Sequence, residues 1–104
     1  MNGLIYVCSP YRGDPEVNTK KARSYCRKIA IEEGDVPIAP HLLFPQFLDD
    51  NTSRERELAM EMNLEILCHA DEIRVFGNEI SDGMSLEIKE AKELGIPVVW
   101  EESK

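Results

Sequence analysis

The segment IRVFGNEISDGMSLE, residues 73–87, indicates an α/β fold. A short apolar run ends at Gly77, a polar turn follows, and a helical pattern begins near Ser81. In an open α/β sheet such a junction lies outside the carboxyl end of a strand, where these folds bind ligands. Glu87 is in the first turn or two of the helix, where free N–H groups and the helix dipole favour an ionised carboxylate. It is a candidate nucleophile or general base, although an ordinary helix-start glutamate is the commoner role.

The remaining sequence repeats this alternation of strands and helices. Residues 4–8, LIYVC, form a continuous apolar run that is typical of a central strand buried on both faces. Thr52 and Glu55 resemble a helix capping box, although Ser53 could also be the cap. Prolines in the next predicted strand suit a sheet edge. We expect the other strands at residues 36–40, 72–76 and 96–100, and the helices at about 17–33, 52–69 and 83–94.

This order of elements predicts a parallel sheet with helices on both faces. We expect one domain over residues 1–104, a compact doubly wound parallel sheet of four strands in the order 2-1-3-4 with three helices, Rossmann-like or flavodoxin-like. The loop at residues 9–14 and the junction at residues 77–87 would then face each other across one crevice. The apolar segment at residues 41–51 would cover something, either as a lid or as an interface. Because a four-stranded sheet is small, we expect a homo-oligomer, a dimer or larger, that hides apolar surface.

Composition and charge narrow the classes of function. Apolar residues make up 42% of the chain and charged residues 31%, which is typical of a soluble globular protein. The net charge of −8 disfavours nucleic acid polymers and anionic membranes as partners, because both are bound by basic surfaces. A single nucleotide is still possible, since one arginine and one helix N-terminus can hold a phosphate. No apolar run in the sequence approaches membrane-spanning length.

The cysteines indicate the redox environment. Cys8, Cys26 and Cys68 are an odd set without C-x-x-C spacing, which indicates reduced thiols in a cytoplasmic protein. His41 and His69 do not form a metal-binding spacing with them. We therefore expect no metal site and no cofactor.

Three side chains outside the junction could reach the predicted crevice. Tyr6 is near the end of the first strand, where spacing alone favours a packed core tyrosine. Arg12, beside Gly13 in a tight polar loop, could hold a phosphate or a carboxylate, and a solvated surface arginine is about as common. Asn63 is in the middle of the second helix, where a capping or core amide is the ordinary reading.

The other candidates lie at the ends of predicted elements. Ser81 and Asp82 are typical helix N-cap residues, a role that is compatible with anion binding. His41 follows the second strand and would point toward the same rim, or would serve as a hydrogen-bonded structural histidine. None of these residues is specific alone, but their convergence in one crevice predicts a ligand site there.

Four motifs along the chain resemble those of a known enzyme family. They are YVCSPYRG at residues 6–13, MNLEILCHAD at 62–71, SDGMSLE at 81–87 with Ala91, and LGIPV at 94–98. In this order they are similar to the nucleoside 2-deoxyribosyltransferase superfamily, nearest to its deoxynucleoside-monophosphate N-glycosidase branch and to small phage and bacterial relatives. The similarity covers most of the chain. It implies a small-molecule partner, a nucleoside or nucleotide.

The resemblance also implies roles for individual residues. Glu87 would attack C1′ of a 2-deoxyribosyl group and form a covalent glycosyl-enzyme intermediate, which water or a second base would release. Tyr6 would orient Glu87, and Arg12 and Ser81 would hold a 5′-phosphate. The transferases carry an acid at the position of Ser81, so serine there favours a nucleotide monophosphate. The implied substrate-binding residues are Ser9, Tyr11, Arg12, Gly13, His41, Ser81, Asp82, Gly83 and Ser85.

Asn63 is the third implied catalytic position, and it departs from the family pattern, because the active enzymes carry an aspartate there. An amide cannot give the leaving base a proton, so Asp82 or His41 would supply it and Asn63 would hydrogen-bond the base or sugar. The first hypothesis is hydrolysis or base transfer at the N-glycosidic bond of a 2-deoxynucleoside or its 5′-monophosphate, through Glu87. The alternative is a catalytically silent nucleotide-binding or sensor domain, and a third reading is an interaction module with a vestigial crevice.

Overall fold

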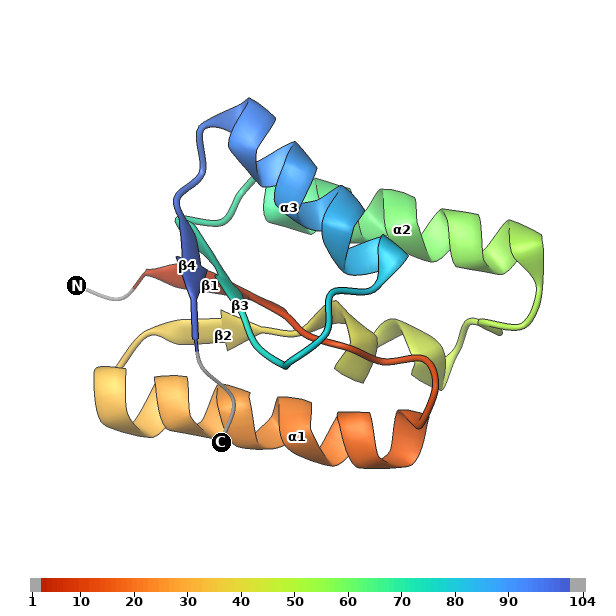
Figure 1. Ribbon diagram of the computed structural model, residues 1–104, viewed down its shortest axis with the longest axis horizontal. Coiled ribbons are helices and arrows are strands. Elements are labelled where there is room, and N and C mark those ends of the chain that lie inside the picture. The colour runs from red at the N-terminus through yellow and green to blue at the C-terminus, as the bar shows by residue number, and fades with distance from the viewer. Residues whose placement is uncertain (1–2, 102–104) are drawn as a thin grey trace.

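Strands and helices alternate along the chain (Figure 1). The computed structural model describes residues 3–101. The strands are β1 (Leu4–Cys8), β2 (Val36–Ile38), β3 (Glu72–Val75) and β4 (Val98–Trp100), and the α-helices are α1 (Pro15–Lys28), α2 (Ser53–Leu67) and α3 (Asp82–Leu94). A π-helical segment (Ile29–Glu33) extends α1, and two short 3-10 turns (Pro40–Leu42 and Phe44–Gln46) lie between β2 and α2.

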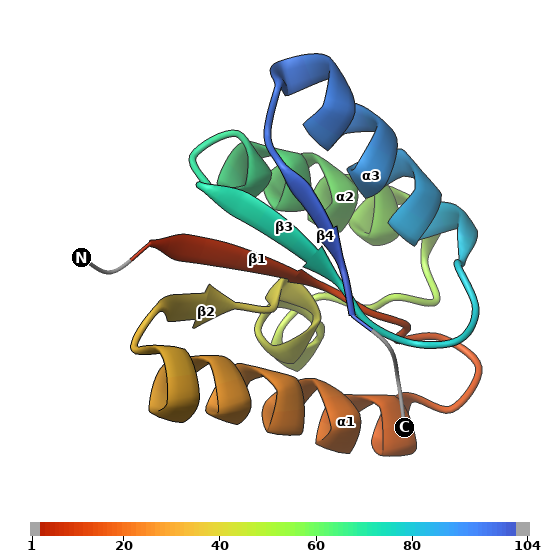
Figure 2. The ribbon, with the colours of Figure 1, turned by 60° about the vertical axis from the view of Figure 1, so that its left-hand side comes forward.

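The strands form one parallel sheet in the order β2-β1-β3-β4, which confirms the predicted order. β1 is central, and its Tyr6 pairs with Ile38 of β2 on one side and with Ile73 of β3 on the other. α1 covers one face of the sheet, and α2 and α3 cover the opposite face (Figure 2). The chain therefore has the doubly wound α/β architecture that its sequence predicts.

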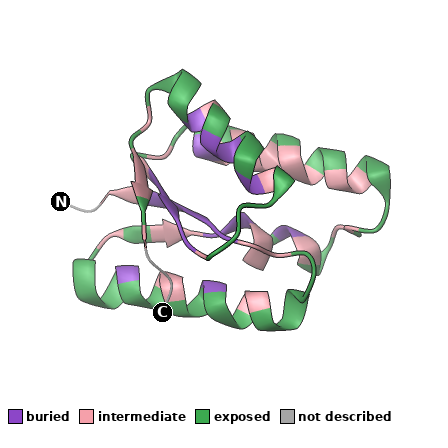
Figure 3. Ribbon diagram, viewed as in Figure 1, coloured by how far each residue is buried: buried purple, intermediate pink, exposed green. Residues whose placement is uncertain are grey.

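The side chains of β1 alternate between two apolar cores, one on each face of the sheet. The core beneath α2 and α3 contains Tyr6, Cys8, Leu67, Ile73, Val75, Met84, Ile88 and Ala91. The core beneath α1 contains Ile5, Val7, Ile29, Ala39 and Phe76. Figure 3 shows the central strands β1 and β3 mostly buried between helices whose outer surfaces are exposed, whereas the edge strands β2 and β4 are mainly half-buried. The continuous apolar run at residues 4–8 is thus explained by burial on both sides.

Two elements near the N-terminal half differ from their predicted bounds. α1 begins at Pro15, two residues before its predicted start, because the Asp14 carboxylate accepts a hydrogen bond from the Val17 N–H at 3.3 Å and caps the helix. β2 ends at Ile38, because Pro40 begins a 3-10 turn. The spacing of apolar residues therefore did not reveal the Asp14 cap of α1 or the 3-10 turn that begins at Pro40.

The start of α2 has the predicted cap but not a complete capping box. The Thr52 hydroxyl accepts a hydrogen bond from the Glu55 N–H at 3.3 Å. The Glu55 carboxylate accepts from the Asp49 N–H at 2.8 Å instead of turning back to Thr52. The other helix and strand ends differ from prediction by one or two residues, at Leu67, Val75, Asp82 and Val98.

One buried ion-pair network joins β3 to the end of the helical segment after α1. Arg74 of β3 is 7% exposed. Its Nη1 donates to Glu33 at 2.6 Å, and its Nη2 and Nε donate to Glu72 at 2.6 and 2.9 Å. Glu101 lies 3.8 Å from Nε. The charge of Arg74 is thus paired on each side, which buried arginines require.

The apolar segment at residues 41–51 covers part of the core beneath α1. Leu42 packs against that core and Phe44 is buried, whereas Phe47 is exposed. Within residues 3–101 no helix is both long enough and apolar enough to cross a lipid bilayer. The homo-oligomer expected from the small sheet stays a prediction.

Candidate active site

Glu87 is held between two donors from β1. The Tyr6 hydroxyl donates a hydrogen bond to Glu87 Oε2, and the Cys8 thiol donates to Oε1 at 3.4 Å. Tyr6 and Cys8 are two residues apart in a strand, so their side chains share one face of the sheet. All three residues are buried, with Glu87 only 8% exposed. Both carboxylate oxygens therefore have a fixed partner, which sets the orientation of the carboxyl group.

Burial dominates the electrostatics of this group. Removal from water raises the pKa of Glu87, and the hydrogen bonds from Tyr6 and Cys8 only partly oppose that rise. Burial and the negative charge of Glu87 also raise the pKa of Tyr6 and of Cys8, so both are protonated donors at neutral pH.

The expected stabilisation of ionised Glu87 by the helix N-terminus is therefore wrong. α3 begins at Asp82, so Glu87 is in the second turn, beyond the free N–H groups of the first turn. The influence of the helix dipole falls off within the first turn. The pKa of Glu87 is accordingly determined by its burial rather than by the dipole of α3.

A second group of side chains lies where β1 and β2 end. Ser9 Oγ and His41 Nε2 are 3.0 Å apart, and the ring of Tyr11 is tilted against that of His41 with centroids 6.2 Å apart. Burial lowers the pKa of His41 to about 4. The imidazole is therefore neutral at pH 7, so it does not supply a proton as an imidazolium. This disfavours His41 as the proton donor to a leaving base.

A hollow of about 350 Å³ lies between the loop after β1 and the loop after β3. Gly77 has a φ of 105°, and a Cβ there would lie 3.0 Å from Cδ of Pro10, so the two loops touch at a position that suits glycine. The expectation that these loops face each other is thus confirmed. Glu87 and Tyr6 do not line this hollow.

Two basic side chains and the N-cap residue of α3 line part of this hollow. Arg12, Lys21 and Ser81 line it. Arg12 Nε also pairs with Asp50 at 3.0 Å and is exposed, so the arginine has a carboxylate partner from the segment after β2. Ser81 caps α3, because its Oγ accepts a hydrogen bond from the Met84 N–H at 3.2 Å. The lining of this hollow therefore combines two positive charges and one carboxylate, that of Glu79, with the N-terminus of a helix.

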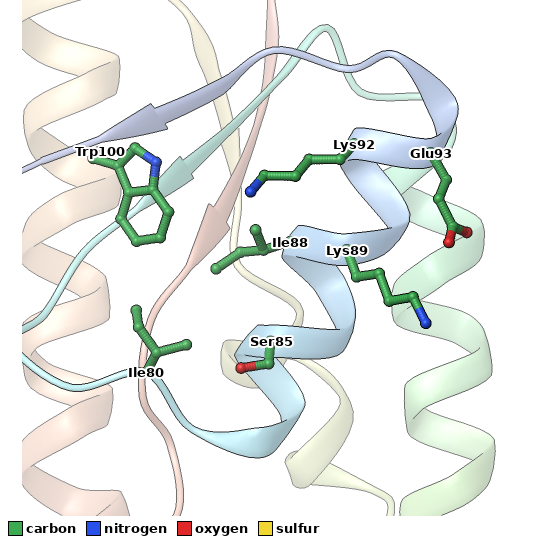
Figure 4. A pocket seen from close by; sticks show the side chains of 7 residues that line it. All are labelled: Ile80, Ser85, Ile88, Lys89, Lys92, Glu93 and Trp100. Atoms are coloured by element: carbon green, nitrogen blue, oxygen red, sulfur yellow. The ribbon is translucent and has the colours of Figure 1, made fainter.

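The other predicted binding residues are dispersed. Gly13, with a φ of 99°, and Asp82 are exposed in the loop after β1 and at the start of α3. Gly83 faces α2, where a Cβ would lie 3.4 Å from Cε of Met60. Ser85 lines a different hollow, of about 490 Å³, together with Trp100 (Figure 4). This larger hollow lies between α3 and β4 and contains none of the contacts of Glu87.

Asn63 of α2 has a buried amide oxygen without a partner. Among residues 3–101 its Oδ1 is the side-chain atom found buried with no hydrogen bond. Asn63 is thus not a helix cap, and if it is a core amide its oxygen lacks a partner. A buried acceptor of this kind is available to a donor from a water molecule or a ligand.

Two residues of interest were missed from the sequence. Cys8 contacts Glu87 directly, and the signal was its position two residues after Tyr6 in a strand. Lys21 reaches the hollow from the second turn of α1. A helical lysine carries no local signal of this kind, because its placement depends on how α1 packs against the sheet.

Comparisons with known proteins agree with this fold. The model of a family described as a domain of unknown function, DUF7768, matches residues 3–101. No curated protein sequence matches the chain. Among solved structures, the 2-deoxyribosyltransferase of the psychrotolerant bacterium Bacillus psychrosaccharolyticus is similar, with a TM-score of 0.74 and 21% identity over 95% of this chain and 72% of that chain. At this level of identity the likeness establishes a common fold.

Proposed function

We propose that this chain, which belongs to the DUF7768 family of domains, cleaves the N-glycosidic bond of a 2-deoxynucleoside or its 5′-monophosphate. The observation that carries the proposal is the buried Glu87, with one oxygen bonded to Tyr6 and the other to Cys8. The fold shared with a 2-deoxyribosyltransferase supports the same reaction class.

Glu87 acts as the nucleophile. Its carboxylate oxygen gives an electron pair to C1′ as the C1′–N bond breaks, and the base leaves with that bond's electrons and takes up a proton. The transition state has oxocarbenium character, which a nearby carboxylate stabilises. Water, or a second base, then attacks C1′, and the electrons of the C1′–O bond return to Glu87. Hydrolysis and transfer differ only in this last acceptor.

Tyr6 and Cys8 position the nucleophile. Each is a neutral donor with a raised pKa, so each holds one oxygen of Glu87 without taking its charge. A carboxylate fixed at both oxygens loses little freedom on reaching the transition state.

A 5′-phosphate would bind at the end of the sheet that carries Arg12, Lys21 and the N-terminus of α3. Both cations line the hollow there, and a helix N-terminus favours an anion. The exposed Arg12 would exchange its half-buried partner Asp50 for the phosphate. Asn63 Oδ1, which has no hydrogen-bond partner in the protein, would accept a hydrogen bond from a sugar hydroxyl or a base amino group. With His41 neutral, water delivers the proton to the leaving base.

Free base released from a panel of 2-deoxynucleosides and their 5′-monophosphates, separated by chromatography, tests this proposal. Adding a second free base to the same reaction separates hydrolysis from transfer, since only transfer forms a new nucleoside. We expect release from at least one monophosphate. If no member of the panel loses its base over long incubation, the chain does not have this activity.

The pH dependence of base release follows from the raised pKa of Glu87. The nucleophile must be ionised, so activity falls as the pH falls through that pKa. We expect the acid limb of kcat to have its midpoint above about 4.3, the ordinary pKa of a glutamate side chain. A profile that is flat down to pH 4 would contradict this assignment.

Replacing Cys8 with alanine tests the positioning role of the thiol. The variant loses one of the two hydrogen bonds to Glu87, and we expect about a fivefold lower kcat, since such a bond is worth about 1 kcal/mol. Because that hydrogen bond lowers the pKa of Glu87, the acid limb should also move to higher pH. Cys8→Ser keeps a donor and should restore both properties. A merely structural role would leave the pH profile in place.

The alternative, a silent nucleotide-binding domain, is favoured by two observations. Asn63 stands where catalysis needs an acid, and a protonated Glu87 with its raised pKa is a poor nucleophile. This reading predicts micromolar binding of a nucleotide by calorimetry without turnover. Detection of free base would exclude it, and absence of binding at millimolar ligand would favour an interaction module instead.

A further inference from the structure

A group of metal-binding side chains lies at the C-terminal end of α2, away from Glu87. Glu65, Cys68 and His69 are exposed, and their ligand atoms all lie within 4.8 Å of one another. The spacing of cysteines and histidines did not indicate a site, because the third ligand is a glutamate one helical turn earlier. On a helix, residues three and four apart share a face. We propose that Glu65, Cys68 and His69 bind one Zn²⁺ ion.

The distances between the ligand atoms support this assignment. His69 Nε2 lies 3.2 Å from Glu65 Oε2, and Cys68 Sγ lies 3.7 Å from the same oxygen. In tetrahedral zinc sites, with bonds of about 2.0–2.3 Å, neighbouring ligand atoms are about 3.3–3.6 Å apart. Small rotations of exposed side chains would therefore place all three atoms on one ion.

The chemistry of the ligands selects the metal. A thiolate and an imidazole disfavour Ca²⁺ and Mg²⁺, which prefer oxygen ligands, and a mixed sulfur, nitrogen and oxygen set suits Zn²⁺. Binding displaces the thiol proton of Cys68 to solvent. The three side chains leave the fourth position to water.

The surroundings also favour a cation. Cys68 is the C-cap of α2, so the ion would lie at the negative end of the helix dipole. The Cys68 thiol is already held by the carbonyl oxygen of Glu65 at 2.9 Å, and the chain carries a net charge of −8. Bound zinc would join the last turn of α2 to the turn that leads into β3, and would stabilise that connection. This proposal does not depend on the proposed function.

Titration of the full chain with Zn²⁺ by calorimetry, and with Co²⁺ by absorption spectroscopy, tests the site. We expect one ion per chain with a dissociation constant in the micromolar range, and a thiolate-to-cobalt charge-transfer band in the near ultraviolet. Zn²⁺ should also raise the midpoint of thermal unfolding, because it binds only the folded chain tightly.

Matched variants distinguish the site from general metal binding. Cys68→Ser and His69→Gln should each weaken zinc binding at least tenfold, and Cys68→Ser should remove the charge-transfer band. Cys26→Ser, at a half-buried thiol in α1, should change neither property. The proposal is wrong if the natural chain does not bind zinc at a zinc concentration of about 100 µM, which already allows for weak association. It is also wrong if both ligand variants bind zinc as tightly as the natural chain.

Discussion

Replacing Glu87 with glutamine is expected to reduce base release from 2-deoxynucleotides by about a thousandfold or more, the scale seen when a nucleophile is removed. Glutamine has nearly the same shape and can still contact Tyr6 and Cys8, so the site keeps its packing. It cannot give an electron pair to C1′ as a carboxylate does, so the covalent intermediate does not form. Chromatography of the released base measures the effect.

The matched control is Glu93→Gln on the same helix. Glu93 is exposed and lines the hollow between α3 and β4, away from Tyr6 and Cys8. This variant removes the same charge from α3 and should leave base release unchanged. Equal loss of activity in the two variants would mean that Glu87 acts through the general charge of α3 and not as a nucleophile.

Glu87→Gln is also expected to be at least as stable as the natural chain at pH 7. Because the pKa of Glu87 is raised in the folded state, the folded chain binds more protons than the unfolded chain between the two pKa values. Its contribution to stability therefore falls as the pH rises through that range. Glutamine does not titrate, so the stability difference should disappear near pH 4. This behaviour separates loss of catalysis from loss of fold.

Replacing Arg74 with leucine is expected to lower the free energy of unfolding by about 2–4 kcal/mol, because breaking a buried ion pair leaves its carboxylates uncompensated. Glu33 and Glu72 would each lose a partner that now lies 2.6 Å away. Both carboxylates reach solvent in part, which keeps the loss below that of a fully buried pair. Urea unfolding followed by circular dichroism measures the change.

Glu101→Gln is the control for this network. Glu101 lies 3.8 Å from Arg74 Nε, the longest of these contacts, and is partly exposed. We expect a loss below about 1 kcal/mol, the usual scale of a surface ion pair. If Arg74→Leu costs no more than Glu101→Gln, the network does not stabilise the fold.

The sheet could be predicted because its determinants are local. The run at residues 4–8 has the continuous apolar character of a central strand, and the prolines after Val36 indicate an edge. Caps at Thr52 and Ser81 were also visible, since their partners are three residues away. Arg74 was not predicted as buried, because its partners Glu33 and Glu101 are distant in sequence.

The candidate site was predictable only in outline. The facing of Tyr6 and Glu87 depends on the pairing of β1 with β3 and on the packing of α3, and the order of elements indicated both. The raised pKa of Glu87 depends on its burial away from water, and the spacing of residues in the sequence does not show how deeply this side chain is buried. Ser85 illustrates the same limit. Two residues before Glu87 on one helix, it lies at a different hollow, because successive helical residues point in different directions.

The most direct test of Glu87 as the nucleophile is the mass of the intact protein after rapid acid quenching of a reaction with a 2-deoxynucleoside 5′-monophosphate that loses its base. We predict an added deoxyribosyl-phosphate group, mapped by peptide fragmentation to Glu87 and absent from Glu87→Gln. Base release without any adduct at the shortest times, or an adduct on another residue, would contradict the account.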